Sequence, residues 1–253
     1  MLSRFADMLI YQSVRYKRLE LLKTQAKKLG IELSDDQLLM FETYYKELID
    51  WNKRVNLTTI TDYDDVQTKH FLDSITAIPY LPNLMPFKAI DIGSGGGFPG
   101  IPLKIMRPDI ELTLVESRGK KAQFLKHVLT ALKLDGVRVI TARAETAASE
   151  AVLRGKYDIA LTRAVGSIST VLELTLPFLK TGGVSVIYKK GEINDDLSHA
   201  TEIAPLLGGI FSKTEPILHN VFPDNRCLLF FSKVSPTSDR YPRRDGMPAK
   251  RPL

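Results

Sequence analysis

Cysteine is almost absent from this sequence, since Cys227 is the only one in 253 residues. Its scarcity excludes an intramolecular disulfide, and it excludes a zinc or iron–sulfur site built from several cysteine ligands. The four histidines are scattered along the chain, so we expect no metal. Cytosine C5 methylation requires a nucleophilic cysteine, whereas Cys227 lies inside an apolar run with no sign of activation.

Long apolar runs are missing as well. The longest, such as residues 227–231, have the length of a strand, whereas a bilayer-spanning helix needs about 20 apolar residues. Residues 1–12 carry one arginine and a short apolar patch, but they lack the hydrophobic region and the cleavage site of a signal peptide. We interpret them as a helix and expect a cytoplasmic protein with no membrane partner.

Basic residues outnumber acidic ones, 35 to 29, which gives a formal net charge of +6 and favours a polyanionic partner. Part of the excess lies in residues 236–253, where five basic and two acidic side chains leave a net charge of +3. The basic members of this tail are Arg240, Arg243, Arg244, Lys250 and Arg251. With 44% hydrophobic residues, the chain can also bury a substantial core.

Residues 1–80 are predicted to form a helical cap. One helix is expected over residues 34–53, where Ser34 and Gln37 resemble a capping box. Its apolar positions at helical spacing are Leu38, Phe41, Tyr45 and Leu48. An earlier helix is expected over residues 15–29 and ends at Gly30.

After about residue 86 the pattern changes to alternating strands, glycine turns and helices, which is typical of a parallel sheet covered on both faces. We predict a doubly wound α/β domain over residues 81–235, with strands at 87–92, 111–116, 137–142, 157–162 and 184–188. Two further apolar runs, 210–219 and 226–234, should form an antiparallel hairpin at the edge of the sheet. Residues 236–253 form the basic C-terminal tail.

A glycine-rich segment, D-I-G-S-G-G-G-F-P-G at 91–100, lies between the first strand and a helix. Glycines allow a tight turn and a close approach to a ligand, so this context predicts a ligand-binding loop. The glycines also match the dinucleotide fingerprint, and Glu116 ends the next strand where a ribose-binding acid belongs. Asp91 favours S-adenosylmethionine instead, because a carboxylate would attract its cationic groups and repel a pyrophosphate. A nicotinamide-dependent oxidoreductase remains the alternative.

Other polar groups occur at strand ends and in the cap. Arg143, Ala144 and Glu145 follow the third strand and suit the edge of an adenine, while Arg163 follows the fourth strand. Lys189 and Lys190 end the fifth strand and could hold phosphate. The cap contributes Asn56, His70 and Asp73.

The pattern of amino-group methyltransferases, Asn or Asp before Pro-Pro-aromatic, does not occur. Guanine N7 carries an in-plane lone pair and no proton, so its methylation needs positioning and electrostatics but no general base. A site made of arginine, asparagine, histidine and lysine suits that reaction.

These motifs together resemble the bacterial small-subunit ribosomal RNA guanine-N7 methyltransferases of the RsmG type, also called glucose-inhibited division protein B. The resemblance runs from about Ser34 to the C-terminus. The motifs that carry it are W-N-K-R-V-N-L-T at 51–58, H-F-L-D-S at 70–74, the glycine segment extended through I-P-L at 101–103, E-S-R-G-K-K at 116–121, R-A-E at 143–145, T-R-A at 162–164, K-K-G at 189–191 and Y-P-R-R-x-G-M-P-A-K-R-P-L at 241–253.

The resemblance implies methyl transfer from S-adenosylmethionine to N7 of guanine 527 in the decoding-region loop of 16S ribosomal RNA. It implies action on the RNA or on the small ribosomal subunit by an enzyme whose loss is associated with low-level streptomycin resistance. Separately, we expect a monomer. A noncatalytic RNA-binding protein on the same fold is the second alternative.

Three sets of site residues follow from the motifs and the resemblance. The expected cofactor-binding residues are Asp91, Gly93, Gly95, Gly97, Phe98, Glu116, Ala144, Glu145 and Arg163. The active-site candidates are Asn56, His70, Asp73, Arg143, Arg163 and Arg226. The expected RNA contacts are Lys189, Lys190, Arg243, Arg244, Lys250 and Arg251.

Overall fold

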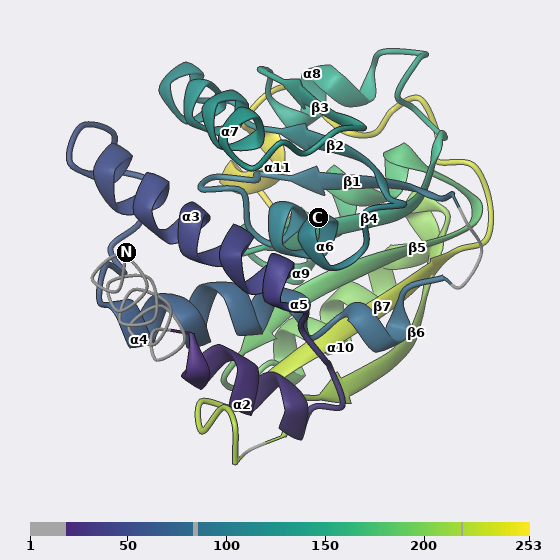
Figure 1. Ribbon diagram of the computed structural model, residues 1–253. Helices are drawn as coiled ribbons and strands as arrows, with labels where there is room; N and C mark the ends of the chain where they lie inside the picture. The colour runs from purple at the N-terminus through teal and green to yellow at the C-terminus, as the bar shows by residue number, and fades with distance from the viewer. Residues whose placement is uncertain (1–18, 83–85, 219) are drawn as a thin grey trace, which may run out of the picture.

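A seven-stranded sheet forms the centre of the molecule (Figure 1). The computed structural model describes residues 19–82, 86–218 and 220–253. The predicted helix at the extreme N-terminus lies outside these ranges. The strand order is β3-β2-β1-β4-β5-β7-β6. The strands are β1 (Lys88–Ile92), β2 (Glu111–Val115), β3 (Val137–Ile140), β4 (Tyr157–Arg163), β5 (Leu179–Lys190), β6 (Gly209–Pro216) and β7 (Arg226–Lys233).

The five strands β1 to β5 are parallel to one another, which confirms the predicted doubly wound core. Strand β7 runs antiparallel to both β5 and β6, so the predicted hairpin forms the edge of the sheet. A register shift between Phe211 and Lys213 interrupts the pairing of β6. Because β1 and β4 are neighbours in the middle of the sheet, the chain reverses its winding direction there, and ligands of open α/β sheets bind at such a point.

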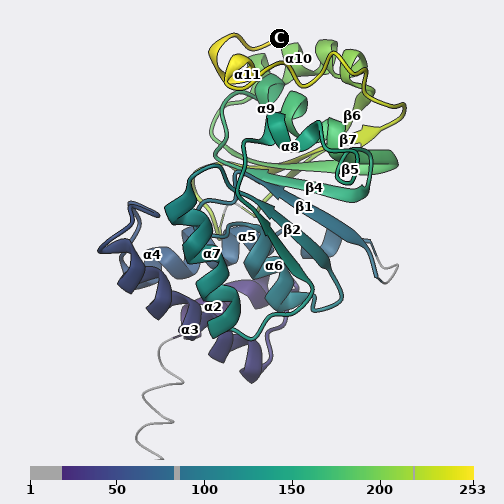
Figure 2. The same cartoon turned by 90° about the horizontal axis from the view of Figure 1, so that it is seen from above.

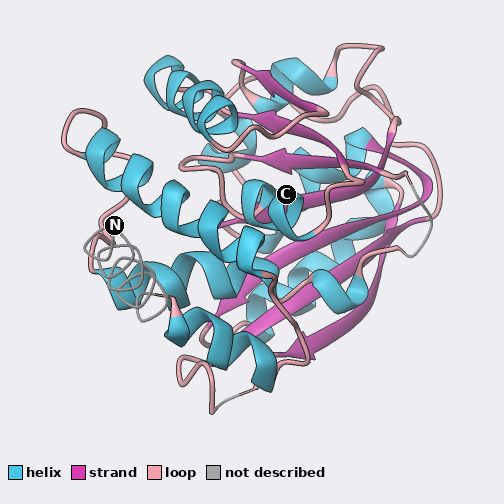
Figure 3. Cartoon of the chain, in the orientation of Figure 1, coloured by secondary structure: helices cyan, strands magenta, loops and turns pink. Residues whose placement is uncertain are grey.

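Helices cover both faces of the sheet (Figures 2 and 3). One layer holds the cap together with α6 and α7, and the other holds α8 to α11. The cap helices are α2 (Glu20–Lys28), α3 (Asp35–Asn52), α4 (Tyr63–Val66), the π-helix η1 (Gln67–Leu72), α5 (Asp73–Ile75) and the short 3-10 helix η2 (Ile78–Tyr80). The remaining helices are α6 (Gly100–Met106), α7 (Gly119–Ala131), α8 (Ala144–Ala148), α9 (Ile168–Thr175), α10 (Asn194–Ile203) and α11 (Met247–Lys250), with 3-10 turns η3 (Leu176–Phe178) and η4 (Ala204–Leu207).

Each face of the sheet has its own hydrophobic core because strand side chains alternate between the two faces. On β1, Ala89 belongs to the core beneath the cap, and Ile90 belongs to the core beneath α8, α9 and α10. The cap helices share the first of these cores with the sheet and with α7. The described part of the cap is therefore joined to the sheet by a continuous apolar interior.

Helix α3 begins where the capping box predicts. The Ser34 hydroxyl accepts the Gln37 amide, and the Gln37 side chain accepts the Ser34 amide. The predicted apolar stripe included Tyr45, but Tyr45 is only half-buried and Tyr44 is completely buried instead. The reason is that residues i+3 and i+4 lie side by side on a helix, so spacing alone does not choose between adjacent tyrosines.

The basic tail lies packed on the second helical layer. Arg243 forms a bidentate ion pair with Glu173 of α9, with a shortest distance of 2.7 Å, and the Glu173 side chain is fully buried. Thr146 donates to Asp245, and the Glu145 carboxylate accepts the Gly246 amide at 2.8 Å. The tail therefore contributes to the fold beside α8 and α9.

Within the described ranges, no helix is long and apolar enough to cross a membrane. Over the same residues, no cluster of three or more histidine, cysteine or acidic side chains has the arrangement of a metal site. Cys227 is buried, and burial raises the pKa of its thiol, which disfavours the thiolate.

Candidate active site

The glycine segment forms a tight loop at the carboxyl end of β1. Gly93, Gly95 and Gly97 have φ of +73°, +56° and +95°, a region that side chains rarely adopt. A Cβ atom at Gly100 would lie 2.7 Å from Leu114 and 2.8 Å from the Asp91 carboxylate. The loop is therefore restricted to glycine both by its backbone conformation and by close packing.

The amides of this loop are mostly occupied by the protein itself. Those of Gly93 and Ser94 donate to Val115 O, those of Gly97 and Phe98 donate to Ser94 O, and that of Gly95 donates to Glu116. The first amide of α6, at Gly100, donates to Asp91 at 3.0 Å. The loop consequently lacks the open cradle of amides that a pyrophosphate requires, which argues against a dinucleotide.

The carbonyl groups of the loop have the opposite character. In the described part of the chain, no donor is hydrogen-bonded to the carbonyl oxygen of Gly93 or Gly95. Free carbonyls beside the carboxylate of Glu116 suit the ammonium, the sulfonium and the ribose hydroxyls of S-adenosylmethionine. The residues present therefore fit this cofactor, which supplies an electrophilic methyl group when bound.

Asp91 supports the loop from behind. Its side chain is completely buried, Oδ2 accepts the Gly100 amide, and no partner within the described residues reaches Oδ1. Burial raises the pKa of this carboxyl to about 7. The predicted direct contact with the cofactor stays a prediction, because the carboxylate has no exposed surface.

Three other predicted cofactor residues lie along the same edge of the sheet. Glu116 follows β2 and accepts the amides of Gly95 and Arg118 at 2.9 and 2.7 Å. Ala144 and Glu145 begin α8, directly after β3. The Glu145 carboxylate accepts the Gly246 amide of the tail, and the predicted contacts of Ala144 and Glu145 with the cofactor stay predictions.

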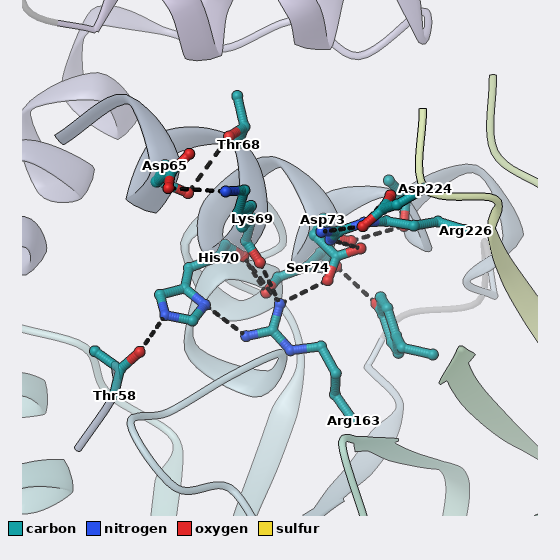
Figure 4. A network of polar contacts seen from close by, with 12 residues as sticks. Thr58, Asp65, Thr68, Lys69, His70, Asp73, Ser74, Arg163, Asp224 and Arg226 are labelled. Atoms are coloured by element: carbon teal, nitrogen blue, oxygen red, sulfur yellow. Dashed lines mark hydrogen bonds and ion pairs between the residues drawn. The ribbon is translucent and has the colours of Figure 1, made fainter. Parts of the chain in front are cut away.

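Arg163 ends β4 and reaches into the cap (Figure 4). Its guanidinium forms an ion pair with Asp73 at 2.7 Å and donates to the carbonyls of Lys69 and His70 at 3.1 and 3.4 Å. It also lies over the ring of Phe98, with 5.1 Å between the guanidinium carbon and the ring centroid. The fourth strand, the cap and the glycine loop therefore meet at this one side chain.

Asp73 joins a second arginine to the network. Its Oδ1 pairs with Arg226 at the start of β7 at 2.7 Å, and Arg226 also contacts Asp224 at 2.9 Å. The side chains of Asp73, Arg163 and Arg226 are only 9%, 14% and 10% exposed. Because both cations are shielded from water, their charges act strongly on neighbouring groups.

The His70 imidazole lies between these groups and the cofactor loop. Its Nδ1 accepts Arg163 at 3.2 Å, its Nε2 lies 2.8 Å from the Thr58 hydroxyl, and its ring stacks on Phe98 with 4.5 Å between centroids. Burial, reinforced by Arg163, lowers the pKa of His70 to about 3. The ring is therefore neutral, with its proton on Nε2, since Nδ1 accepts a bond from a guanidinium.

The π-helix η1 explains how the cap reaches Arg163. In a π-helix the hydrogen bonds connect residues five apart, which widens the turn and alters where the carbonyls point. Helix η1 carries Lys69 and His70, whose carbonyl oxygens accept Arg163. Such single-turn irregularities occur often at functional sites.

A cavity of about 600 Å³ opens beside this network at the carboxyl ends of β4 and β5. Its charged lining residues are Lys69, Asp73, Arg163, Lys189, Lys190, Asp224 and Arg226. Five cations against two carboxylates leave a net charge of +3, with the neutral His70 among them. The cavity therefore suits an electron-rich or anionic ligand next to the cofactor loop.

The predicted site residues divide into two groups. His70, Asp73, Arg163 and Arg226 come together, although 153 residues separate the paired Asp73 and Arg226 in the sequence. Arg143 and Asn56 are exposed, and neither is hydrogen-bonded through its side chain to another described residue. In the W-N-K-R-V-N motif the structural role belongs to Asn52, whose side chain binds Leu57 and Thr58 and so places the partner of His70.

The expected RNA contacts also differ from one another. Lys189 donates to Gly166 O and pairs with Asp196, and Arg243 is committed to Glu173. Lys190, Arg244, Lys250 and Arg251 are exposed, and the last three line a second hollow of about 510 Å³. Sequence reasoning gave no role to Thr58, Asp224 or Tyr44. Thr58 ends the motif at 51–58, but only the fold shows that its hydroxyl lies beside His70.

Two features define this chain as a methyltransferase of the Rossmann-like, S-adenosylmethionine-dependent class. One is the strand order with its single reversed strand, and the other is a glycine loop with free carbonyl groups. More narrowly, the chain belongs to the GidB family, because the family model described as rRNA small subunit methyltransferase G matches residues 37–220.

Curated relatives agree with this assignment. The "Ribosomal RNA small subunit methyltransferase G" of Dehalococcoides mccartyi is 46% identical, over 89% of this chain and 95% of that protein. The protein of the same name from Roseiflexus sp. is 42% identical, over 93% of this chain and 100% of that protein. The Staphylococcus aureus protein of that name is 40% identical, over 92% and 98%.

Solved structures support the fold. A chain of the complex between the Haloferax volcanii Trm112 methyltransferase activator and its methyltransferase superposes with a TM-score of 0.55 at 11% identity, covering 75% of this chain and 98% of that chain. A variant of the 16S rRNA (adenine(1408)-N(1))-methyltransferase from Catenulisporales acidiphilia gives 0.51 at 14% identity, covering 61% and 88%.

Proposed function

We propose that this protein transfers a methyl group from S-adenosylmethionine to N7 of a guanine in the decoding-region loop of 16S ribosomal RNA. The observation that carries the proposal is the cationic cavity beside the glycine loop, with Arg163 bordering both. Family membership supports ribosomal RNA of the small subunit as the substrate.

The chemistry of the cavity suits a nucleophile that needs no general base. Guanine N7 has a lone pair in the plane of the ring and no proton to lose. The imidazole of His70 stays neutral and directs Nδ1 to Arg163, so it orients groups without having to accept a proton from the substrate. Rate enhancement then comes from holding N7 in line with the methyl group and from fixed charges.

The donors of the cavity favour guanine over adenine. Guanine presents an acceptor at O6, whereas adenine presents an amino donor at the same position. Arg163, Arg226 and Lys69 can only donate, so an adenine amino group would face donors without an acceptor. The carboxylates of Asp73 and Asp224 hold the arginines and can balance the positive charge that methylation places on the base.

The RNA partner is expected to approach over the carboxyl edge of the sheet. Lys190, Arg244, Lys250 and Arg251 are exposed there or on the tail and would contact phosphates. A flipped or looped-out base can enter the cavity, because single-stranded RNA exposes base edges that an A-form helix conceals. We propose that the protein acts as a monomer in the cytoplasm, where small subunits assemble.

The decisive experiment measures the transfer of labelled methyl groups to small subunits purified from cells that lack this gene. The modified base is located by strand cleavage selective for N7-methylguanine. Label at one guanine of the decoding-region loop is the expected result. Label elsewhere would contradict the base assignment, and absence of label despite binding of S-adenosylhomocysteine would favour a noncatalytic RNA-binding protein.

A variant pair tests the role of Arg163. Arg163→Ala should lower methyl transfer by at least about tenfold. The substitution removes the guanidinium that pairs with Asp73, donates to His70 and lies over the Phe98 ring. Arg107→Ala is the matched control, since Arg107 also forms a partly buried ion pair, with Asp109, at the opposite end of the sheet. Full activity of Arg163→Ala, with unchanged cofactor affinity, would rule out the proposed mechanism.

A further inference from the structure

The phenol of Tyr44 connects the cap to the cofactor loop. Tyr44 belongs to α3 and is completely buried, and its hydroxyl donates to the carbonyl of Gly96 at 2.5 Å. A buried hydroxyl is unfavourable unless it is hydrogen-bonded, and apolar packing alone would be served equally well by phenylalanine. The hydroxyl is therefore explained by the loop and not by the core.

This contact fixes one peptide unit of the loop at both ends. Gly96 C=O and Gly97 N–H belong to the same trans peptide and point in opposite directions. The carbonyl is held by Tyr44, and the amide donates to Ser94 O at 2.7 Å. With that peptide locked, the turn that carries the free carbonyls of Gly93 and Gly95 is held in one conformation.

The glycine at position 97 makes room for this arrangement. A Cβ atom there would overlap the Tyr44 hydroxyl and the Ile101 side chain, and φ is +95°. One glycine of the run is thus required by the approach of a cap side chain. Ligand contact alone does not account for it.

The ring of Tyr44 extends the connection to the substrate cavity. It stacks on Phe98 with 5.3 Å between centroids and 16° between planes, and Phe98 stacks in turn on His70 at 4.5 Å and 15°. Offset stacks of this kind stabilise the relative orientation of the rings. A single side chain therefore supports both the loop and the imidazole that borders the cavity.

We propose that Tyr44 is a positioning residue with two separable parts: its hydroxyl orders the cofactor loop, and its ring orders Phe98 and His70. The inference requires the cofactor but not the identity of the methylated base. Cofactor binding is measured without RNA, so the role of Tyr44 can be refuted while the proposed function stands. The proposed function can likewise be refuted while the role of Tyr44 stands.

Calorimetric titration with S-adenosylhomocysteine tests the hydroxyl. Tyr44→Phe should raise Kd about three- to tenfold, which corresponds to one lost hydrogen bond. Tyr157→Phe is the matched control, because Tyr157 is also a buried phenol whose hydroxyl donates, to Thr113 at 3.1 Å, but it lies at the start of β4. All titrations are done well below the melting temperature of each variant, so that only folded protein is compared.

Steady-state kinetics test the ring. Tyr44→Phe keeps the stack and should raise KM for S-adenosylmethionine with kcat nearly unchanged. Tyr44→Leu removes the stack as well and should lower kcat in addition. Equal Kd values for Tyr44→Phe and Tyr157→Phe would overturn the role of the hydroxyl, whatever their melting temperatures. Equal kcat for Tyr44→Phe and Tyr44→Leu would overturn the role of the ring.

Discussion

The His70 imidazole lies among groups that keep it uncharged. Arg163 and Arg226 both disfavour a positive charge on the ring, and burial acts in the same direction. The result is a histidine that behaves as a fixed acceptor and donor over the physiological range, instead of the pH switch that this residue often provides. Such a residue can orient Arg163 without competing for protons with the reaction.

The pKa of about 3 gives a prediction for the pH profile. Nuclear magnetic resonance should show that the His70 ring, identified by comparison with His70→Gln, stays neutral from about pH 5 to pH 8, and methyl transfer should show no inflection due to it. The unfolded chain binds this proton below about 6.5, so His70 makes stability fall as pH drops from 6.5 toward 3. Titration of His70 near 6.5 in the folded protein would contradict this account.

At the level of residues, the sequence predicted which side chains gather at the cavity better than it predicted how they are arranged. His70, Asp73 and Arg163 stood out because each lies in a distinctive segment near a cap helix or a strand end. Asn52 and Asn56 share one motif, and only the fold shows that Asn52 holds the loop while Asn56 is exposed. The sequence likewise did not show that Tyr44, and not Tyr45, is the buried tyrosine. Tyr44 is distinguished by its contact with Gly96, which is distant in the sequence.

At the level of elements, apolar runs and glycine turns located all seven strands. Strands β1, β2, β4 and β7 are buried along most of their length, whereas β3 and β6, at the two edges of the sheet, are mostly half-buried or exposed. The π-helix η1 was not predictable, since its wider turn is stabilised by contacts to Arg163, 93 residues from His70. The docking of the tail was not predictable either. Arg243 and Glu173 are 70 residues apart in the sequence, and no sequence pattern indicates that they form an ion pair.

The tail pair gives a prediction for stability. Arg243→Ala should lower the free energy of unfolding by about 3 kcal/mol, because it leaves the Glu173 carboxylate buried without a cation. Arg244→Ala replaces an exposed neighbour and should change the free energy of unfolding by less than about 0.5 kcal/mol. Urea denaturation of both variants measures the difference. Similar values for the two would show that the tail is not anchored as described.

At the level of the whole molecule, the two ends of the sheet have different neighbours. The carboxyl end carries the glycine loop, the cavity and the exposed cations near the tail. The opposite end has its own basic residues, Lys88, Arg138 and Lys156, around a hollow of about 660 Å³. Net charge alone therefore does not tell which end meets RNA, and we propose the carboxyl end because the glycine loop lies there.

The dependence of RNA binding on salt distinguishes the two ends. Replacing Arg244, Lys250 and Arg251 by glutamine should reduce the slope of log K against log salt by about 2, since each phosphate contact with single-stranded RNA contributes about 0.7. The same replacement of Lys88, Arg138 and Lys156 should leave the slope unchanged. A larger effect from the second set would place the RNA at the wrong end of the sheet for methyl transfer.

The pairing of Glu173 with Arg243 also sets an order of events during synthesis. The ribosome makes Glu173 70 residues before Arg243. At about 5–20 residues per second, the carboxylate waits roughly 4 to 14 seconds for its cation. Helix α9 thus carries an uncompensated charge until Arg243 has been added, and the layer of α8 and α9 gains its contact with the tail only after that.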